Sequence, residues 1–325
     1  MTLYRDDRDQ LDRLFVRCAD GLGIDVALVE KDYWAIEALR AVAAGFVVTG
    51  TGGAVTYRPV FKGGTSLSKV HGLIHRFSED IDLLVPVAGN LSNNQRSDVM
   101  KTLTSQIGEL WGEPGERTGG RKGVDLHWRV PYETTVTTNL DGAAAVEPSV
   151  LVEVTVMGGD QPSLDAVVTS LAADTASELG LAGFDDLTAV EAIALDPRRT
   201  LVEKLAMLHD AATRATPDSP GRLAKAGRHY YDIAMLLSSD DVTSELTSDF
   251  VAEIAADADA WSALGKFPFT SRPDSGFAAS PAFDLDVIAT HVQAGYDAAL
   301  RWVWSGPKPS LAECVAVIRR HDSKL

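Results

Sequence analysis

Phe61-Lys-Gly-Gly-Thr-Ser-Leu-Ser-Lys69 and the closely following Arg76-Phe-Ser-Glu-Asp-Ile-Asp-Leu-Leu-Val85 decide the fold class of this chain. The first stretch predicts a glycine turn that leads into a short helix, and the second predicts an apolar strand carrying Asp80 and Asp82. Side chains alternate along a strand, so both carboxylates leave one face while the apolar residues between them point into the core. Two adjacent negative charges on a core strand are seldom found without a cation to hold them; the alternative is a solvated strand end. Hard oxygen ligands of this kind suit Mg²⁺ that carries a nucleoside triphosphate.

Together these features predict the layout of a nucleotidyltransferase. Nucleotidyl transfer depends on positioning the triphosphate and cancelling its charge, so the glycine turn is the expected phosphate-binding element. Gly63 and Gly64 would let the backbone approach the phosphates, and the amides that open the following helix would face them. Gly64, Ser66 and Lys69 are therefore predicted to bind the nucleotide. Ser66, or Ser78 just before the acids, could donate a hydroxyl. The alternative for the glycine pair is an ordinary turn.

A third carboxylate is expected from a neighbouring strand. Glu153 is the only acid in the otherwise apolar stretch Val150-Leu-Val-Glu-Val-Thr-Val156. We predict that Glu153 either completes a metal site with Asp80 and Asp82 or takes the proton of the attacking hydroxyl. The alternative is an acid that faces water on an edge strand.

Two further candidates lie on predicted helices. Lys204 stands at the border of an apolar stripe, from which it could meet the β- and γ-phosphates as a point charge. The alternative is a surface lysine whose stem packs along the helix. Asp232 could orient Lys204 or bind the nucleotide. Because Arg228 stands four residues earlier, a plain i,i+4 ion pair is the alternative for Asp232.

Length and periodicity predict an α+β chain of two domains. The 325 residues, 45% of them hydrophobic, suffice for two cores at about 150 residues each. We expect N-terminal helices and a nucleotidyltransferase-like mixed β-sheet core over residues 1–160. A mainly α-helical C-terminal domain over residues 161–325 would contribute to the active-site cleft and give a bilobed molecule.

The expected elements follow from hydrophobic periodicity. Helices are predicted over residues 7–21, 25–44, 66–71, 92–111, 163–179, 198–214, 220–238, 248–264, 284–305 and 310–321, and strands over residues 59–62, 80–85, 124–131, 134–138 and 150–157. The glycine-rich and charged residues 112–123 predict a mobile loop, and residues 266–276 predict a second loop. Beyond Asp160 the pattern is almost wholly helical.

The charge distribution limits the class of partner. A formal net charge of −16 argues against a nonspecific nucleic-acid binder, whose affinity comes from lysine and arginine. Between Arg198 and His229, however, seven cationic and three acidic side chains give a local charge of +4. Such a local basic surface suits one polyanion in one defined site. The alternative is ordinary surface charge on two solvated helices.

The remaining bulk features predict a cytoplasmic protein that does not enter a membrane. No run of about 18 apolar residues exists, and the start of the chain lacks a secretion-signal pattern. Cys18 and Cys314, the two cysteines, have no metal-ligand spacing and fit a reducing compartment.

Four stretches resemble the AbiEii/AbiGii toxin family, which includes the MenT toxins and lies within the polymerase-β-like nucleotidyltransferase superfamily. They are Val29-Glu-Lys-Asp-Tyr-Trp34, Phe61–Lys69 with Arg76–Leu83, Arg199-Thr-Leu-Val-Glu-Lys-Leu205 and His229-Tyr-Tyr-Asp-Ile233. The resemblance implies a toxin of a toxin–antitoxin or phage-defence system, encoded beside an AbiEi-type antitoxin. It also implies use of Mg²⁺ and a nucleoside triphosphate, with transfer to the 3′ acceptor end of tRNA that stops aminoacylation.

The same resemblance places Ser78, Asp80, Lys204 and Asp232 on the family's active-site positions, with Asp82 as the second acid of the pair. Glu153 comes from the strand pattern and not from the resemblance. The expected function is thus Mg²⁺-dependent transfer of a nucleotide from an NTP to RNA, with pyrophosphate released. Two alternatives stay open: the same chemistry on a protein or small molecule, and a nucleotide-binding partner that acts without turnover.

Overall fold

The computed structural model describes residues 2–50, 53–78, 80–110, 112, 114–134, 136–137, 145–216, 221–265 and 269–325. The chain divides into two compact units. The first unit comprises Met1–Val70, Glu79–Val156 and Ser163–Ala194, and the second comprises His71–Ser78, Met157–Pro162 and Leu195–Leu325. Both units are therefore built from discontinuous segments. None of the described helices has the length and apolar character that crossing a membrane requires.

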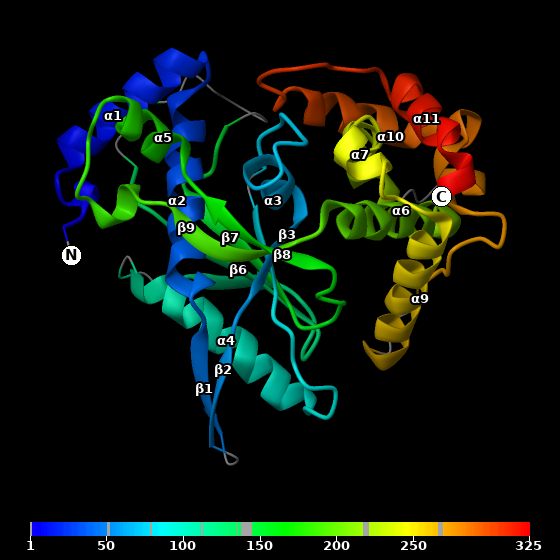
Figure 1. Ribbon diagram of the computed structural model, residues 1–325, viewed down its shortest axis with the longest axis horizontal. Coiled ribbons are helices and arrows are strands. Elements are labelled where there is room, and N and C mark those ends of the chain that lie inside the picture. Colours follow the sequence, from blue (N-terminus) through cyan, green and yellow to red (C-terminus); the bar gives the residue numbers. More distant parts are fainter. Residues whose placement is uncertain are drawn as a thin grey trace. The chain divides into compact units, whose positions relative to one another are not determined.

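The predicted α+β class is confirmed, with the sheet in the first unit (Figure 1). Its helices are α1 (Arg8–Leu22), α2 (Val26–Ala43), α3 (Gly63–Lys69), α4 (Asn93–Leu110) and α5 (Leu171–Glu178). Strands β1 (Phe46–Gly50) and β2 (Gly53–Tyr57) form a separate hairpin. The seven-stranded sheet has the order β5 (Glu116–Gly119), β6 (Asp125–Pro131), β7 (Ser149–Thr155), β4 (Asp80–Leu84), β3 (Val60–Lys62), β9 (Val190–Leu195) and β8 (Ser163–Val168).

The sheet is mixed, and its two faces differ in polarity. Strand β4 runs parallel to β7 and antiparallel to β3, which in turn runs parallel to β9. On one face Ile81, Leu83, Val152 and Val154 are buried, and α2 and α4 pack against this face (Figure 1). Because side chains alternate along a strand, the other face receives the polar residues of β4 and β7.

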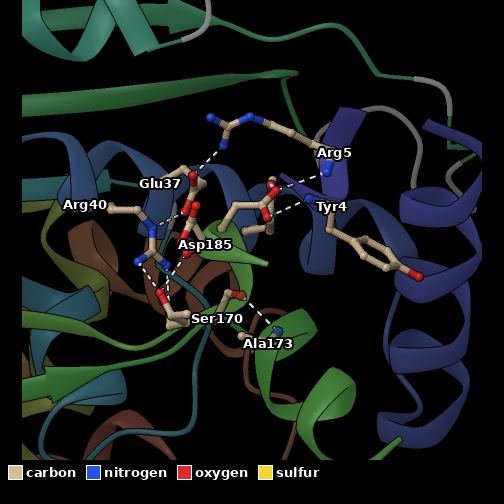
Figure 2. Close-up of polar contacts among 10 residues, drawn as sticks. Tyr4, Arg5, Glu37, Arg40, Ser170, Ala173 and Asp185 are labelled. Carbon is tan, nitrogen blue, oxygen red and sulfur yellow. Dashed lines mark hydrogen bonds and ion pairs between the residues drawn. The ribbon is translucent and has the colours of Figure 1, made fainter. Parts of the chain in front are cut away.

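The helix α2 carries several buried charged residues, and each described partner lies in the first unit. Glu37 binds both Arg5 and Arg40, whose Nε lies 2.6 Å from Glu37 Oε1 (Figure 2). Asp32 accepts a hydrogen bond of 2.6 Å from the backbone N–H of Leu171, at the start of α5. Because a buried charge is tolerated only when it is paired, these contacts fix α2 against its neighbours. Val29–Trp34, the first stretch of the family resemblance, therefore lies on α2 and helps to hold this helix against its neighbours.

Glu30 of α2 is expected to make stability depend on pH. Its carboxyl is buried and accepts a hydrogen bond from Thr134, and burial raises the pKa of Glu30 to about 7. The folded state therefore retains a proton that the unfolded state releases near pH 4.5, so stability falls as pH rises from about 4.5 to 7.

We expect Glu30→Gln, which mimics the protonated form, to gain about 1–3 kcal/mol relative to the parent protein between pH 5 and pH 8. Urea unfolding at both pH values measures this difference. Glu191→Gln, at an exposed position, is the control and is expected to follow the parent. Equal pH dependence of Glu30→Gln and the parent would contradict the assignment.

The second unit is helical, with α6 (Pro197–Arg214), α7 (Gly227–Leu237), α8 (Asp240–Thr243), α9 (Ser248–Gly265), α10 (Leu285–Leu300) and α11 (Leu311–Arg320). Helix α7 packs against α6, α10 and α11, and its Tyr230, Ile233 and Leu237 are buried as predicted. A Cβ at Gly227 would lie 2.3 Å from the backbone nitrogen of Tyr296. Glycine at that position therefore allows α7 and α10 to approach closely.

Several sequence-based element predictions are wrong. Residues 163–168 of the predicted helix 163–179 form β8, and β9 was not predicted, so the chain beyond Asp160 is less helical than expected. The predicted loop 112–123 contains β5. These strands are short and lie at or near sheet edges, where pairing with a distant partner outweighs local preference. Of the predicted strand 134–138, the described residues are not in a strand, and residues 135 and 138 lie outside the described part; residues 266–268 of the second predicted loop also lie outside it.

Candidate functional site

Asp80 and Asp82 leave the same face of β4, as the alternation predicts. Both are half-buried, whereas Ile81 between them is fully buried. Asp82 pairs in register with Lys62 of β3 on one side and with Glu153 of β7 on the other. Directly paired residues of neighbouring strands share a face, so the acids of β4 and β7 lie side by side.

Gly63 and Gly64 begin α3 and do not form a separate turn before it, and they lie directly against this acidic face. Gly63 has a φ of 75°, and a Cβ built on it would lie only 1.9 Å from Oδ2 of Asp82. Thr65 Oγ1 donates a 2.6 Å hydrogen bond to the carbonyl oxygen of Asp80, which ties α3 to β4. Only glycine satisfies both the left-handed backbone and this close approach. The start of α3 is therefore fitted closely to Asp82.

Gly63→Ala is expected to disturb the acidic face beyond its backbone strain. The left-handed conformation costs alanine about 1–2 kcal/mol, and the methyl group would also push the Asp82 carboxylate aside. Gly72→Ala is the matched control, because Gly72 has a φ of 61° but no neighbouring atom within 4 Å of an added Cβ. We expect Gly63→Ala to lose more stability than Gly72→Ala in urea unfolding, because only Gly63→Ala adds a clash with Asp82, and nucleotide transfer to be lost in Gly63→Ala alone. Equal transfer activity in both variants would contradict the close fit of Gly63 and carboxylate.

Glu153 has a neighbour that the sequence analysis did not include. His127 of β6 pairs in register with Glu153, and its Nδ1 lies 3.8 Å from Glu153 Oε1. Both side chains are about one third exposed. Glu153 therefore lies on an internal strand of the sheet, and the alternative of an edge-strand acid is wrong.

The donor set suits a divalent cation bound by two carboxylates. Across the described residues, no group of three or more His, Cys, Asp or Glu side chains could by itself hold a metal ion. Mg²⁺ is commonly bound through one or two carboxylates, with water and substrate phosphates completing its coordination. Asp80 and Asp82, half-buried hard oxygen donors on one face beside a side-chain-free glycine, fit that requirement.

The predicted nucleotide-binding residues of the first unit differ in their surroundings. Ser66 is buried, and within the described part of the chain its Oγ has no hydrogen-bond partner. An unsatisfied buried hydroxyl invites an explanation such as a ligand. Lys69 instead forms an ion pair with Asp32 of α2, with Nζ 2.7 Å from Oδ1. This pair gives Lys69 a structural partner that the sequence pattern did not reveal.

A buried ionic cluster occupies the second unit. Asp232 of α7 is fully buried and accepts hydrogen bonds from Arg76 Nε (2.7 Å) and Arg76 Nη2 (2.8 Å). Lys204 of α6 donates to the same carboxylate at 2.9 Å and lies 3.4 Å from Nδ1 of His229. The structure thus places Lys204 and Asp232 in direct contact. Arg76, supplied from 156 residues earlier in the chain, was not predicted as a site residue.

The cluster carries an excess of positive charge. Burial alone would raise the pKa of Asp232, but Arg76 and Lys204 hold that pKa far below its ordinary range. Burial also lowers the pKa of Lys204, and burial next to Lys204 lowers the pKa of His229 well below its usual value. With His229 neutral, two cations and one carboxylate leave a net charge of +1. Such a centre can bind an anionic group.

The basic surface expected between Arg198 and His229 is largely neutralised. Four acids outside the segment offset the excess of +4: Asp196 and Glu245 pair with Arg198, Asp257 pairs with Arg199, and Asp232 pairs with Lys204. Arg199 and Lys204 are also buried. The local excess of +4 in the sequence is therefore not an open basic surface in the fold.

The predicted site residues divide between the two units, and each set is described within its own unit. Gly64, Ser66, Lys69, Asp80, Asp82 and Glu153 belong to the first unit, and Ser78, Lys204 and Asp232 belong to the second. Ser78 is half-buried and ends the segment His71–Ser78 that carries Arg76. Within each unit the structure brings together Asp82 with Glu153 and Lys204 with Asp232.

A glycine pair that begins α3 and packs against two same-face aspartates of a mixed sheet is the arrangement expected of a nucleotidyltransferase. Residues 55–311 match the family described as the nucleotidyl transferase AbiEii toxin of type IV toxin–antitoxin systems. The chain belongs to this family, since the match covers more than three quarters of its 325 residues. Membership implies a nucleotide substrate and an antitoxin partner, and nucleotidyltransferases of this kind generally use a divalent metal.

Comparison with solved structures finds MenT4, a nucleotidyltransferase toxin from Mycobacterium tuberculosis H37Rv. Its sequence is 17% identical to this chain, and the alignment covers 95% of this chain and 94% of MenT4 with a TM-score of 0.37. No curated protein matches the sequence significantly.

Proposed function

We propose that this protein is a toxin that transfers a nucleotide from an NTP to the 3′ acceptor end of tRNA. The modified tRNA would no longer be aminoacylated, and translation in the cytoplasm would stop. The observation that carries the proposal is the pairing of Asp80 and Asp82 on one face of β4 with the close approach of Gly63. An AbiEi-type antitoxin is the proposed partner that counteracts the toxin.

Asp80 and Asp82 are the residues that would hold Mg²⁺. When bound, the ion would neutralise charge on the triphosphate and favour the attacking hydroxyl in its deprotonated form. Glu153, in register with Asp82, is proposed as the proton acceptor and not as a third ligand, because no three described acids are placed to hold a metal by themselves. The Gly63–Gly64 pair offers phosphates a backbone without side chains, and the buried Ser66 hydroxyl would gain a partner.

The proposed reaction balances as a single displacement. The 3′-hydroxyl oxygen of the RNA forms a bond to the α-phosphorus of the NTP, and the bond from this phosphorus to the pyrophosphate oxygen breaks. Glu153 takes the hydroxyl proton. Lys204, held by Asp232, compensates charge on the departing phosphates, and Ser78 is proposed to donate a hydrogen bond to the triphosphate.

The decisive experiment incubates the protein with each α-³²P-labelled NTP, MgCl₂ and total tRNA. We expect label in tRNA with at least one NTP, release of pyrophosphate, and loss of both with EDTA or in Asp80→Asn. Label in protein or in a small-molecule fraction instead would redirect the chemistry to another acceptor. Tight NTP binding without pyrophosphate release under any nucleotide would overturn the enzymatic reading.

A further inference from the structure

A small pocket in the first unit concentrates positive charge on an otherwise acidic protein. It lies between α4 and the β5–β6 hairpin, at the edge of the sheet, and has a volume of about 170 Å³. Lys101, Arg117, Arg121 and Lys122 line it together with Asp125. Four cations and one carboxylate give the lining a net charge of +3, whereas the whole chain carries −16.

The cations of this pocket are held differently from those of the second unit. Arg117 donates to the carbonyl oxygens of Gly119 (2.9 Å) and Gly120 (2.6 Å), which orients its guanidinium without neutralising it. Arg121 pairs with Asp125 at 2.8 Å. Lys101 and Lys122 are exposed and have no ion-pair partner within the described residues. The charge is therefore available to an incoming anion.

An aromatic ring and apolar side chains form the remaining wall. Trp128 of β6 is half-buried, and its Nε1 donates a 3.1 Å hydrogen bond to the carbonyl oxygen of Pro114, which fixes the ring. Met100 and Leu126, both buried, also line the pocket. Cationic side chains around a fixed aromatic ring suit a phosphate together with a stacked base, the combination that binds single-stranded nucleic acid.

The position of the pocket matches an acceptor strand better than the reacting NTP. Three strand spacings of about 4.8 Å separate β4 from β5, about 14 Å within the plane of the sheet, and an RNA strand that joins the two sites would also pass around the β5 edge. The side chain of Trp128 projects from the helix-covered face of the sheet, whereas those of Asp82 and Glu153 project from the opposite face. An NTP bound at the acids therefore cannot also fill this pocket. We propose that the pocket holds one nucleotide of the RNA acceptor, a few residues upstream of its reacting 3′ end. This inference rests on the proposed function.

The test measures RNA binding separately from transfer. Asp80→Asn protein is titrated with a fluorescein-labelled RNA hairpin that ends in a single-stranded 3′ tail, with and without Lys101→Glu/Lys122→Glu. We expect the charge reversal to weaken binding at least about tenfold and to lower the salt slope of log Kd by about 1.5–2. Arg13→Glu/Lys308→Glu, at two other exposed positions, changes the net charge equally and is expected to leave binding near that of the parent.

In active protein, the pocket variant is expected to raise KM for tRNA with little change in kcat or in the Kd for NTP. Trp128→Leu is expected to weaken RNA binding without changing the salt slope, because it removes stacking and no charge. If transfer to tRNA occurs but both pairs of charge reversals behave alike, the pocket inference is wrong and the proposed function stands. If parent protein labels no RNA, the proposed function fails, and RNA binding that still depends on Lys101 and Lys122 would support the pocket alone. Absence of RNA binding by the Asp80→Asn protein would overturn the pocket inference.

Discussion

Asp80→Asn is expected to lower nucleotide transfer by roughly 10³-fold or more and to abolish growth inhibition, with the fold preserved. The amide keeps the shape of the carboxylate but removes one of the two charges that would bind the metal. Without metal, the variant should be at least as stable as the parent, because Asp80 and Asp82 are like charges on one face of β4. Transfer assays and urea unfolding measure the two effects independently.

Ligand-dependent stability gives a second readout for Asp80. Mg²⁺ with a nonhydrolysable NTP analogue is expected to raise the Tm of the parent, since a ligand that binds only the folded state stabilises it. The shift should be largely lost in Asp80→Asn and retained in Asp241→Asn, which removes one charge at an exposed position of α8. An Asp80→Asn protein that still inhibits growth would refute the role of the β4 aspartates.

Asp232→Asn is expected to destabilise the second unit by about 3–5 kcal/mol, because it leaves Arg76 and Lys204 buried without their counter-charge. Lys204→Met keeps the Arg76–Asp232 pair, whose two hydrogen bonds are 2.7 and 2.8 Å long. We therefore expect Lys204→Met to stay close to the parent in stability while losing transfer activity. Denaturant unfolding combined with transfer assays separates the structural residue from the functional one.

The pH dependence of stability tests whether the ionised Asp232 carboxylate stabilises the folded state. The pKa of Asp232 lies below its ordinary value because of Arg76 and Lys204. Its contribution to stability is thus complete above about pH 4 and is lost as pH falls further. Asp232→Asn should flatten the acid limb of the stability curve. An unchanged acid limb, or an Asp232→Asn protein as stable as the parent, would show that the buried pair does not contribute as its geometry implies.

Local patterns predicted the acidic face well because it is built from neighbouring residues. Alternation along β4 places Asp80 and Asp82 together, and Gly63 follows β3, the antiparallel neighbour of β4. Most helices were also predicted within a few residues, since their apolar stripes are long. These features depend on period and spacing, which a single sequence displays.

Long-range partners could not be predicted in the same way. Nothing in the vicinity of Asp232 indicates that Arg76 rather than Arg228 engages its carboxylate, since Arg76 comes from a distant segment. Lys69 resembled a phosphate ligand, but its partner Asp32 lies on a helix 37 residues earlier. Strands β5, β8 and β9 are defined by pairing and carry little local signal. The predicted basic surface at residues 198–229 failed for the same reason. Its neutralising acids Asp257 and Glu245 lie on or near other helices, outside the segment.

The order of strands in the sheet also bears on how the toxin is made. Strand β3, which leads into Gly63, is flanked by β4 and by β9, and β9 ends at Leu195. A nascent chain that has emerged only as far as residue 160 would expose the backbone groups of β3 along one side, an edge prone to aggregation. Synthesis interrupted before β9 would thus release a fragment whose sheet is incomplete beside the strand that leads into Gly63.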